Sequence, residues 1–142
     1  MTAATGIRAD AARWASLGRP AAVAGAAIGA LTVVAAIDPN EPGHYPTCPF
    51  LALTGHTCPG CGSLRALHAL TRGDLAAAIS RNVLMVASVP LLVWLWVRWA
   101  QRSWTGAGRS RPAPAAALWS GVVLVVAFWT LRNLAVGAAL AP

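Results

Sequence analysis

The residues best suited to chemistry in this sequence lie close together. All three cysteines and all three histidines of the 142-residue chain fall between His44 and His68. Thiolates and imidazoles are common nucleophiles, redox groups and transition-metal ligands in proteins. Because the rest of the chain has neither, we expect any chemistry of this protein to reside in this stretch.

One interpretation of the stretch is a metal site. The run Cys58-Pro-Gly-Cys61-Gly is similar to the C-P-x-C-G knuckle of zinc ribbons and rubredoxins, in which a turn directs two sulfurs at one ion. Cys48 and one histidine could complete a tetrahedral Cys₃His zinc site. The histidines available for it are His44, His56 and His68.

A second interpretation is a disulfide or a redox pair that uses Cys58 and Cys61. A C-x-x-C run at the start of a helix has a lowered thiol pKa, because the helix N-terminus favours the thiolate. The apolar spacing that begins at Ser63 predicts such a helix. Three cysteines would leave one unpaired, and no thioredoxin-like βαβ pattern surrounds the motif.

A third interpretation assigns the cysteines no chemistry. Free thiols pack well as small buried groups, and a Pro-Gly pair is typical of a turn. All three interpretations fit the residues.

Two arginines could act with this stretch. Arg65 follows Cys61 by four residues, about one helical turn, so it could stabilise a Cys61 thiolate or bind an anionic lipid headgroup. Arg132 could contact the cysteine loop from a distant part of the chain. Arg132, like Arg65, could also bind an anion or a lipid headgroup. The simpler expectation for Arg65 is that its charge extends to the membrane surface, and for Asn82, Arg132 and Asn133 that they pair within a helix bundle or face water.

The composition excludes several classes of protein. The chain is 57% hydrophobic and only 11% charged, whereas soluble domains carry roughly 25% charged residues. Its hydrophobicity also excludes intrinsic disorder. The formal net charge is +7, but the arginines lie at the edges of apolar segments and form no stripe with interleaved aromatics. We therefore expect no binding to nucleic acid.

Three apolar segments are long enough to cross the roughly 30 Å hydrocarbon core of a bilayer. Asp74 is a suitable N-cap, so the second helix could begin at Leu75, and Pro90 inside it should kink it. We predict an all-α membrane protein with about three transmembrane helices and a short interfacial Cys-bearing helix between the first two. The segments are a basic lead 1–19, the spans 20–37, 82–99 and 113–131, a Cys/His connection 38–81, a basic loop 100–112 and a tail 132–142.

The first span contains the G-x-x-x-G pair Gly25 and Gly29. Small residues at this spacing let another helix approach closely, which predicts a homo-oligomer or a complex with another membrane protein. Cleavage of this span as a signal peptide is a rival interpretation, because Val34 and Ala36 satisfy the small-residue pattern. The arginine-bearing lead is long for a signal peptide.

The arginines also predict the orientation of the chain. The lead and the 100–112 region are strongly basic, whereas the 38–81 connection has as many acids as arginines. Positive segments stay in the cytoplasm, so we expect the N-terminus inside and the cysteine loop on the outer side. Tryptophans near the span ends fit the aromatic belts of membrane interfaces.

The run from Cys48 to Asp74 resembles a family of bacterial membrane proteins described as domain of unknown function 2752. Its hallmark is C-P-G-C-G followed by R-A, a leucine and then G-D before a membrane helix, and the resemblance extends over about residues 44–136. It implies the bacterial cytoplasmic membrane and carries no established activity. The matching residues are Cys58, Cys61, Gly62, Arg65, Gly73 and Asp74.

Two positions depart from the family pattern. Family members often have Asn-Pro where this chain has Asn82-Val83, so we expect no special break of the helix there. His56 occupies a position that looks variable in the family, which weakens it as a metal ligand.

Other catalytic motifs are absent from the sequence. There is no phosphate-binding loop, no nucleophile elbow and no H-E-x-x-H zinc motif, and four acidic residues offer no convincing carboxylate pair. We assign no catalytic residue. The sequence favours an accessory or interaction subunit whose cysteines form a structural disulfide or zinc clamp, and the alternative is a membrane thiol–disulfide or metal-handling protein that uses the CPGC motif directly.

Overall fold

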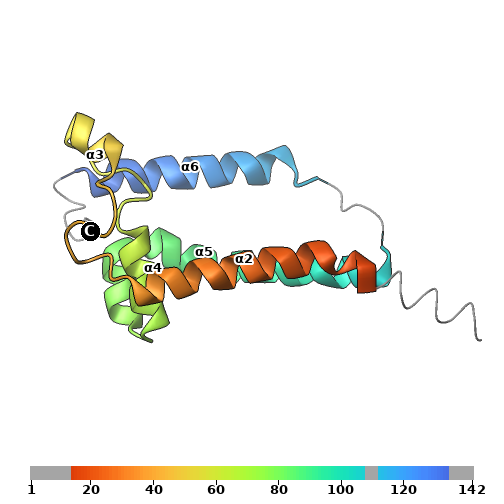
Figure 1. The fold of residues 1–142 in the computed structure, drawn as a ribbon. Helices are drawn as coiled ribbons and strands as arrows, with labels where there is room; N and C mark the ends of the chain where they lie inside the picture. The colour runs from red at the N-terminus through yellow and green to blue at the C-terminus, as the bar shows by residue number, and fades with distance from the viewer. Residues whose placement is uncertain (1–13, 108–111, 135–142) are drawn as a thin grey trace, which may run out of the picture. The chain divides into compact units, whose positions relative to one another are not determined.

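The computed structural model describes residues 14–107 and 112–134. Within them the chain is helical and has no strand, which confirms the predicted fold class (Figure 1). The predictions that concern Arg8, Arg13, Arg109 and Arg111, and the tail from residue 135 onward, lie outside the described residues. The helices are α2 (Gly18–Ala36), α3 (Pro49–Thr54), α4 (Ser63–Thr71), α5 (Leu75–Thr105) and α6 (Ala115–Arg132).

Three of these helices, α2, α5 and α6, are long and apolar enough to cross a membrane. Their most apolar stretches are almost entirely unburied, with 11%, 0% and 11% of residues buried, so these surfaces are available to lipid. The structure places the spans close to the predicted segments. It extends the second helix to Thr105, so that six residues of the predicted basic loop 100–112 are helical.

The described chain divides into two compact units, one built from residues 14–30 with 90–107 and the other from residues 31–89 with 112–134. In the first unit, the start of α2 pairs with the end of α5. Trp96 donates its indole N–H to the Pro20 carbonyl at 3.1 Å, and the rings of Trp14 and Trp104 meet edge to face at 5.2 Å. These tryptophans therefore hold two helices together.

Gly25 and Gly29 have no close neighbour within the described chain. A methyl group built on either glycine meets nothing within 4 Å. Their small surface is thus not used for packing inside this chain, and the predicted contact with a second helix remains a prediction.

The second unit contains α3 and α4, which confirm the predicted short helical structure between the first two spans. The cysteines lie just before these helices, not within them. Cys48 is the residue before α3, and Cys58 and Cys61 lie in the turn that leads into α4. Two short helices therefore direct their N-terminal ends to the cysteines.

The Gly73-Asp74 pair joins α4 to α5. Gly73 has a φ of 76°, and its N–H bonds to Leu70 O while the N–H of Asp74 bonds to Ala69 O. This is the Schellman arrangement that ends a helix at a left-handed residue, a conformation that favours glycine. The Asp74 carboxylate then accepts the Ala77 N–H at 2.8 Å, which confirms Asp74 as the N-cap of the next helix.

α5 breaks at Asn82, where φ is −162° and ψ is 92°. The expectation of no break there was wrong, since Asn82 is the one residue inside α5 with non-helical dihedral angles. Pro90 also lies inside α5, and the kink predicted there remains a prediction. Asn82 makes the break without a following proline because its side-chain oxygen accepts the Met85 N–H at 3.0 Å. It thereby caps a new helix of about 34 Å that begins at Val83.

We predict that Asn82→Ala lowers the thermal stability of the purified protein in detergent, measured by loss of helical circular dichroism. The change removes a helix cap, which costs about 1 kcal/mol, and it removes the Asn82 hydrogen bonds to the cysteine turn, which contribute about 0.5–1.5 kcal/mol each. Asn82→Ser should recover about 1 kcal/mol because serine also caps helices. Ser80→Ala is the control, since the exposed Ser80 hydroxyl bonds only to Ala77 O of its own helix. Equal melting temperatures for Asn82→Ala and Ser80→Ala would contradict this role.

Candidate functional site

The three cysteine sulfurs form one cluster. Sγ of Cys58 lies 3.0 Å from Sγ of Cys61 and 3.5 Å from Sγ of Cys48, and all three sulfurs lie within 4.8 Å of one another. All three cysteines are free. The predicted combination of Cys48 with the CPGC pair is thus what the fold brings together, and three sulfurs this close could hold a metal ion.

The CPGCG turn positions two of the sulfurs. The N–H of Cys61 bonds to Cys58 O at 3.1 Å, which closes the turn, and the N–H of Cys58 points at Sγ of Cys61 at 3.2 Å. Gly62 follows with a φ of 82°, a left-handed conformation that favours glycine. This step turns the chain into α4, so Cys61 becomes the buried member of the cluster, with 8% of its surface exposed.

None of the histidines joins the sulfur cluster. Nδ1 of the buried His68 lies 2.8 Å from Val34 O in the last turn of α2. Nδ1 of His44 lies 3.0 Å from Asp38 O, and Nδ1 of His56 lies 2.8 Å from Thr54 O. The structure therefore assembles the three cysteines of the predicted Cys₃His site without its histidine.

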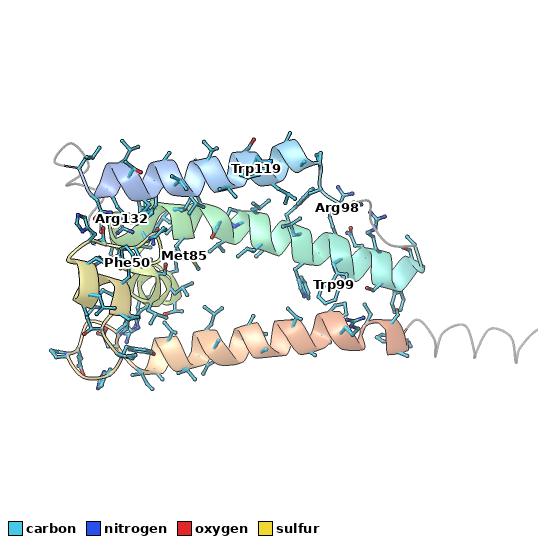
Figure 2. The ribbon with its side chains drawn as sticks, turned by 90° about the horizontal axis from the view of Figure 1, so that it is seen from above. Phe50, Met85, Arg98, Trp99, Trp119 and Arg132 are labelled. Carbon is cyan, nitrogen blue, oxygen red and sulfur yellow. The ribbon has the colours of Figure 1, made fainter. Side chains whose placement is uncertain are left out.

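Arg132 holds the cysteine turn from the end of α6. Its side chain is buried, with 3% exposed, and lies over the Phe128 ring at 5.0 Å. Figure 2 labels Arg132 at the end of α6. Its Nη1 donates to the carbonyl oxygens of Cys58 at 3.2 Å and Cys61 at 3.2 Å, with Pro59 O at 3.4 Å. The contact between Arg132 and the cysteine loop that the sequence suggested is present.

Asn82 holds the same turn from α5. Its side chain is 2% exposed, and its Nδ2 donates to Pro59 O at 3.0 Å, Cys61 O at 3.2 Å and Ser63 Oγ at 3.1 Å. One amide therefore caps the membrane helix with its oxygen and fixes the cysteine turn with its nitrogen.

Asn133 and Trp129 fix the residue before the turn. The Asn133 side-chain oxygen accepts the Thr57 N–H at 2.9 Å, and its nitrogen donates to Thr57 O at 2.9 Å. Trp129 donates its indole N–H to the same carbonyl at 2.8 Å. Side chains therefore donate hydrogen bonds to the carbonyls of residues 57, 58, 59 and 61. The donors are Asn82 in α5, Trp129 and Arg132 near the end of α6, and Asn133 directly after it.

Arg65 points elsewhere. Its Nε donates to Pro39 O at 3.5 Å, in the segment that follows α2. The predicted place beside Cys61 is taken instead by Arg132, whose Nη1 bonds to Cys61 O. A lipid contact of Arg65 remains a prediction.

The three thiols differ in acidity. Burial raises the pKa of Cys61 to about 12, with a further rise from the neighbouring Cys58 thiol. The pKa of Cys48 is lowered, mainly because the Leu51 backbone N–H at the start of α3 favours its thiolate, with a second contribution from the Cys58 thiol. Without a metal, Cys48 is the more acidic and more accessible thiol, and Cys61 is the buried one with the raised pKa.

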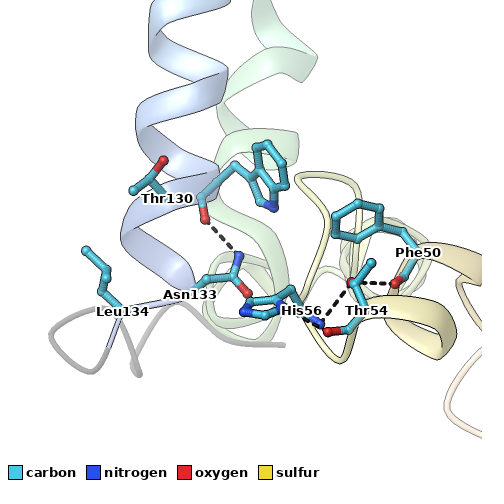
Figure 3. A pocket seen from close by; sticks show the side chains of 7 residues that line it. Phe50, Thr54, His56, Thr130, Asn133 and Leu134 are labelled. Atoms are coloured by element: carbon cyan, nitrogen blue, oxygen red, sulfur yellow. Dashed lines mark hydrogen bonds between the residues drawn. The ribbon is translucent and has the colours of Figure 1, made fainter.

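A pocket of about 470 Å³ lies beside the cysteine loop (Figure 3). Its wall includes the rings of Phe50 and Trp129, which meet edge to face at 5.6 Å. No cysteine lines it, so it is separate from the sulfur cluster. The lining residues are Phe50, Thr54, His56, Trp129, Thr130, Asn133 and Leu134.

Comparison with known proteins supports the resemblance that the cysteine motif carried. The family described as "Protein of unknown function (DUF2752)" matches residues 48–96 of this chain. The match includes all three cysteines and Asn82 and ends before α6, so the predicted similarity around residues 129–133 lies beyond it. No curated protein and no solved structure matches the chain.

Sequence reasoning identified the sulfurs but not how they are held. Asn82 and Asn133 were expected only to pair within the bundle or face water, and Trp129 only to lie at a membrane interface. The one available signal was a polar side chain at each end of an apolar span, which indicates a functional position but not its partner.

We predict that native, reduced and metal-free protein is alkylated by iodoacetamide fastest at Cys48 and slowest at Cys61. The thiolate is the reactive form, so the lowered pKa favours Cys48, and burial protects Cys61. Between pH 7 and pH 9 the Cys61 rate should rise about tenfold per pH unit, since its pKa of about 12 lies above that range. Peptide mapping by mass spectrometry measures each site. Cys61 reacting first would contradict this order.

Proposed function

We propose that this chain is a small integral membrane protein in which Cys48, Cys58 and Cys61 hold one divalent thiophilic metal ion, with Zn²⁺ as the resident ion. The observation that carries the proposal is the cluster of three free sulfurs within 4.8 Å. Tetrahedral zinc–sulfur geometry requires sulfurs about 3.8 Å apart, from Zn–S bonds of about 2.3 Å. The separations of 3.0 and 3.5 Å need only a small opening to admit the ion.

The charge around the cluster supports a divalent ion. Nε and Nη2 of Arg132 are buried without a hydrogen-bond partner, and no carboxylate among the described residues is paired with it. A buried positive charge needs a compensating negative charge. Three thiolates on a divalent ion carry one negative charge, which matches the single charge of Arg132.

The metal would act as a structural clamp. It would join Cys48, before α3, to the turn before α4, and hydrogen bonds already fasten that turn to Asn82 and Arg132 on the membrane helices. The clamped loop would present α3, where Leu53 is 87% exposed, as an apolar surface toward lipid or a membrane partner. We therefore favour an accessory or interaction subunit over an enzyme.

A second candidate function is thiol–disulfide exchange by Cys58 and Cys61. The observation in its favour is their sulfur separation of 3.0 Å, since a disulfide needs a C-x-x-C pair that can approach to about 2.05 Å. In this function the Cys58 thiolate would attack a substrate disulfide, which releases one substrate thiolate and forms a mixed disulfide. Cys61, 3.0 Å from Cys58, would then attack the Cys58 sulfur as the resolving thiol, which forms the Cys58–Cys61 disulfide and releases the second substrate thiolate.

Orientation and assembly belong to the same proposal. The basic segments support an orientation with the N-terminus in the cytoplasm and the cysteine loop on the outer side of a bacterial cytoplasmic membrane. A methyl group built on Gly25 or Gly29 meets no atom of residues 14–107 or 112–134 within 4 Å, and the two glycines would pack against a second copy or another membrane protein within the lipid bilayer.

We predict that protein purified in detergent from zinc-supplied cells contains one zinc per chain by mass spectrometry of metals. Cys48→Ser, Cys58→Ser and Cys61→Ser should each lose the metal and lower the melting temperature, because three ligands are the minimum for a stable site. His56→Ala is the matched control and should keep the metal, because His56 is held by Thr54 O.

Alkylation in denaturant with chelator and without reductant separates the two candidate functions. Three adducts per chain, together with bound zinc, support the metal clamp. One adduct means that two cysteines form a disulfide, which overturns the clamp and supports thiol–disulfide exchange.

We also predict the topology from reporter fusions. Alkaline phosphatase fused after residue 43 should be active, because it would lie outside, and green fluorescent protein fused after residue 107 should fluoresce, because it would lie inside. The reverse pattern would contradict the orientation that the arginines predict.

A further inference from the structure

We infer that the metal centre keeps its fourth coordination position open to a small neutral nitrogen donor, an imidazole, supplied from outside this chain. The inference rests on the proposed metal clamp. It adds that the clamp is also a ligand-binding site, with water as the resting ligand and imidazole as the class of group that replaces it.

The ligand inventory of the chain leaves that position free. Zinc takes four ligands, and the sulfur cluster contains three. Among the described residues, no further cysteine, histidine or carboxylate has a ligand atom in the cluster. A zinc ion with three protein ligands holds a water or another exchangeable ligand in its fourth position.

The histidines of this chain are occupied elsewhere. His68 is buried against Val34 O and lies near Asp38. His44 contacts Asp38 O and lies 3.4 Å from the Glu41 carboxylate. His56 is the nearest in sequence, but its Nδ1 is directed to Thr54 O.

Burial shows which side of the cluster is open. Cys61 is buried, whereas Cys48 and Cys58 are each partly exposed. Asn82 and Arg132 occupy the side behind the turn, where they bond to its carbonyls. An external ligand would therefore approach over Cys48 and Cys58.

Charge balance selects a neutral ligand. A divalent ion with three thiolates has one net negative charge, and Arg132 offsets it from a buried position. An anionic fourth ligand would give the centre two net negative charges, of which Arg132 offsets only one, and this is unfavourable beside the buried side of the cluster. An imidazole adds no charge and is a common zinc ligand.

Cobalt substitution tests the inference on the full-length protein, purified in detergent with a tag free of histidine and with a phosphine as reductant. Co²⁺ bound by thiolates gives an intense sulfur-to-cobalt band and visible bands that respond to the fourth ligand. We expect imidazole to shift the visible bands in a saturable, single-site titration while the sulfur-to-cobalt band persists. Azide, an anion of small size, should bind at least tenfold more weakly.

The outcomes separate this inference from the proposed function. If no sulfur-to-cobalt band develops, the metal clamp itself is wrong. If the band develops and imidazole leaves the visible bands unchanged, the clamp stands and the open position is wrong. A changed spectrum in His44→Ala, His56→Ala or His68→Ala before imidazole is added also overturns it, because the chain would then supply its own fourth ligand. Azide binding as tight as imidazole overturns the selection by charge.

Discussion

The cysteine turn depends on side-chain hydrogen bonds in addition to the one that its own backbone makes. The carbonyls of residues 57, 58, 59 and 61 belong to no regular element, and their contacts are buried or partly buried. Unpaired carbonyls in such a place are costly. Arg132, Asn82, Asn133 and Trp129 donate to all four of them, so the turn keeps one conformation and the sulfurs stay together.

This requirement explains polar residues at the ends of otherwise apolar helices. Asn82 interrupts α5, yet its side chain caps the helix that follows and fixes the cysteine turn at the same time. Arg132 brings a full charge into a buried position, and three neighbouring thiols are the groups that could neutralise it. The cysteine turn, the helix break and the buried charge therefore depend on one another. Asn82 and Arg132 pair the carbonyls of the turn, and the thiols that the turn holds could neutralise the charge of Arg132.

The arrangement also distinguishes the cluster from an ordinary zinc knuckle. A knuckle that ends with two cysteines needs a second knuckle to complete its metal site, whereas here Cys48 joins the pair from the start of α3. The result has three sulfurs and one buried arginine. A structural site with four protein ligands would be closed, and this one has the donor set of a site with room for an external ligand.

Much of this protein was readable from its sequence. Apolar segments longer than a bilayer core predicted the three long helices, Asp74 predicted a helix start, and the spacing after Ser63 predicted α4, because each signal acts over a few residues. The CPGCG motif and Cys48 marked the site, since such groups occur nowhere else. The sequence alone did not reveal that Asn82 breaks its helix without a proline, that no histidine reaches the sulfurs, or that Arg132 holds the turn. The contacts of Asn82 and Arg132 with the turn join residues 21 to 74 apart along the chain, and only tertiary structure decides which distant donor meets which carbonyl.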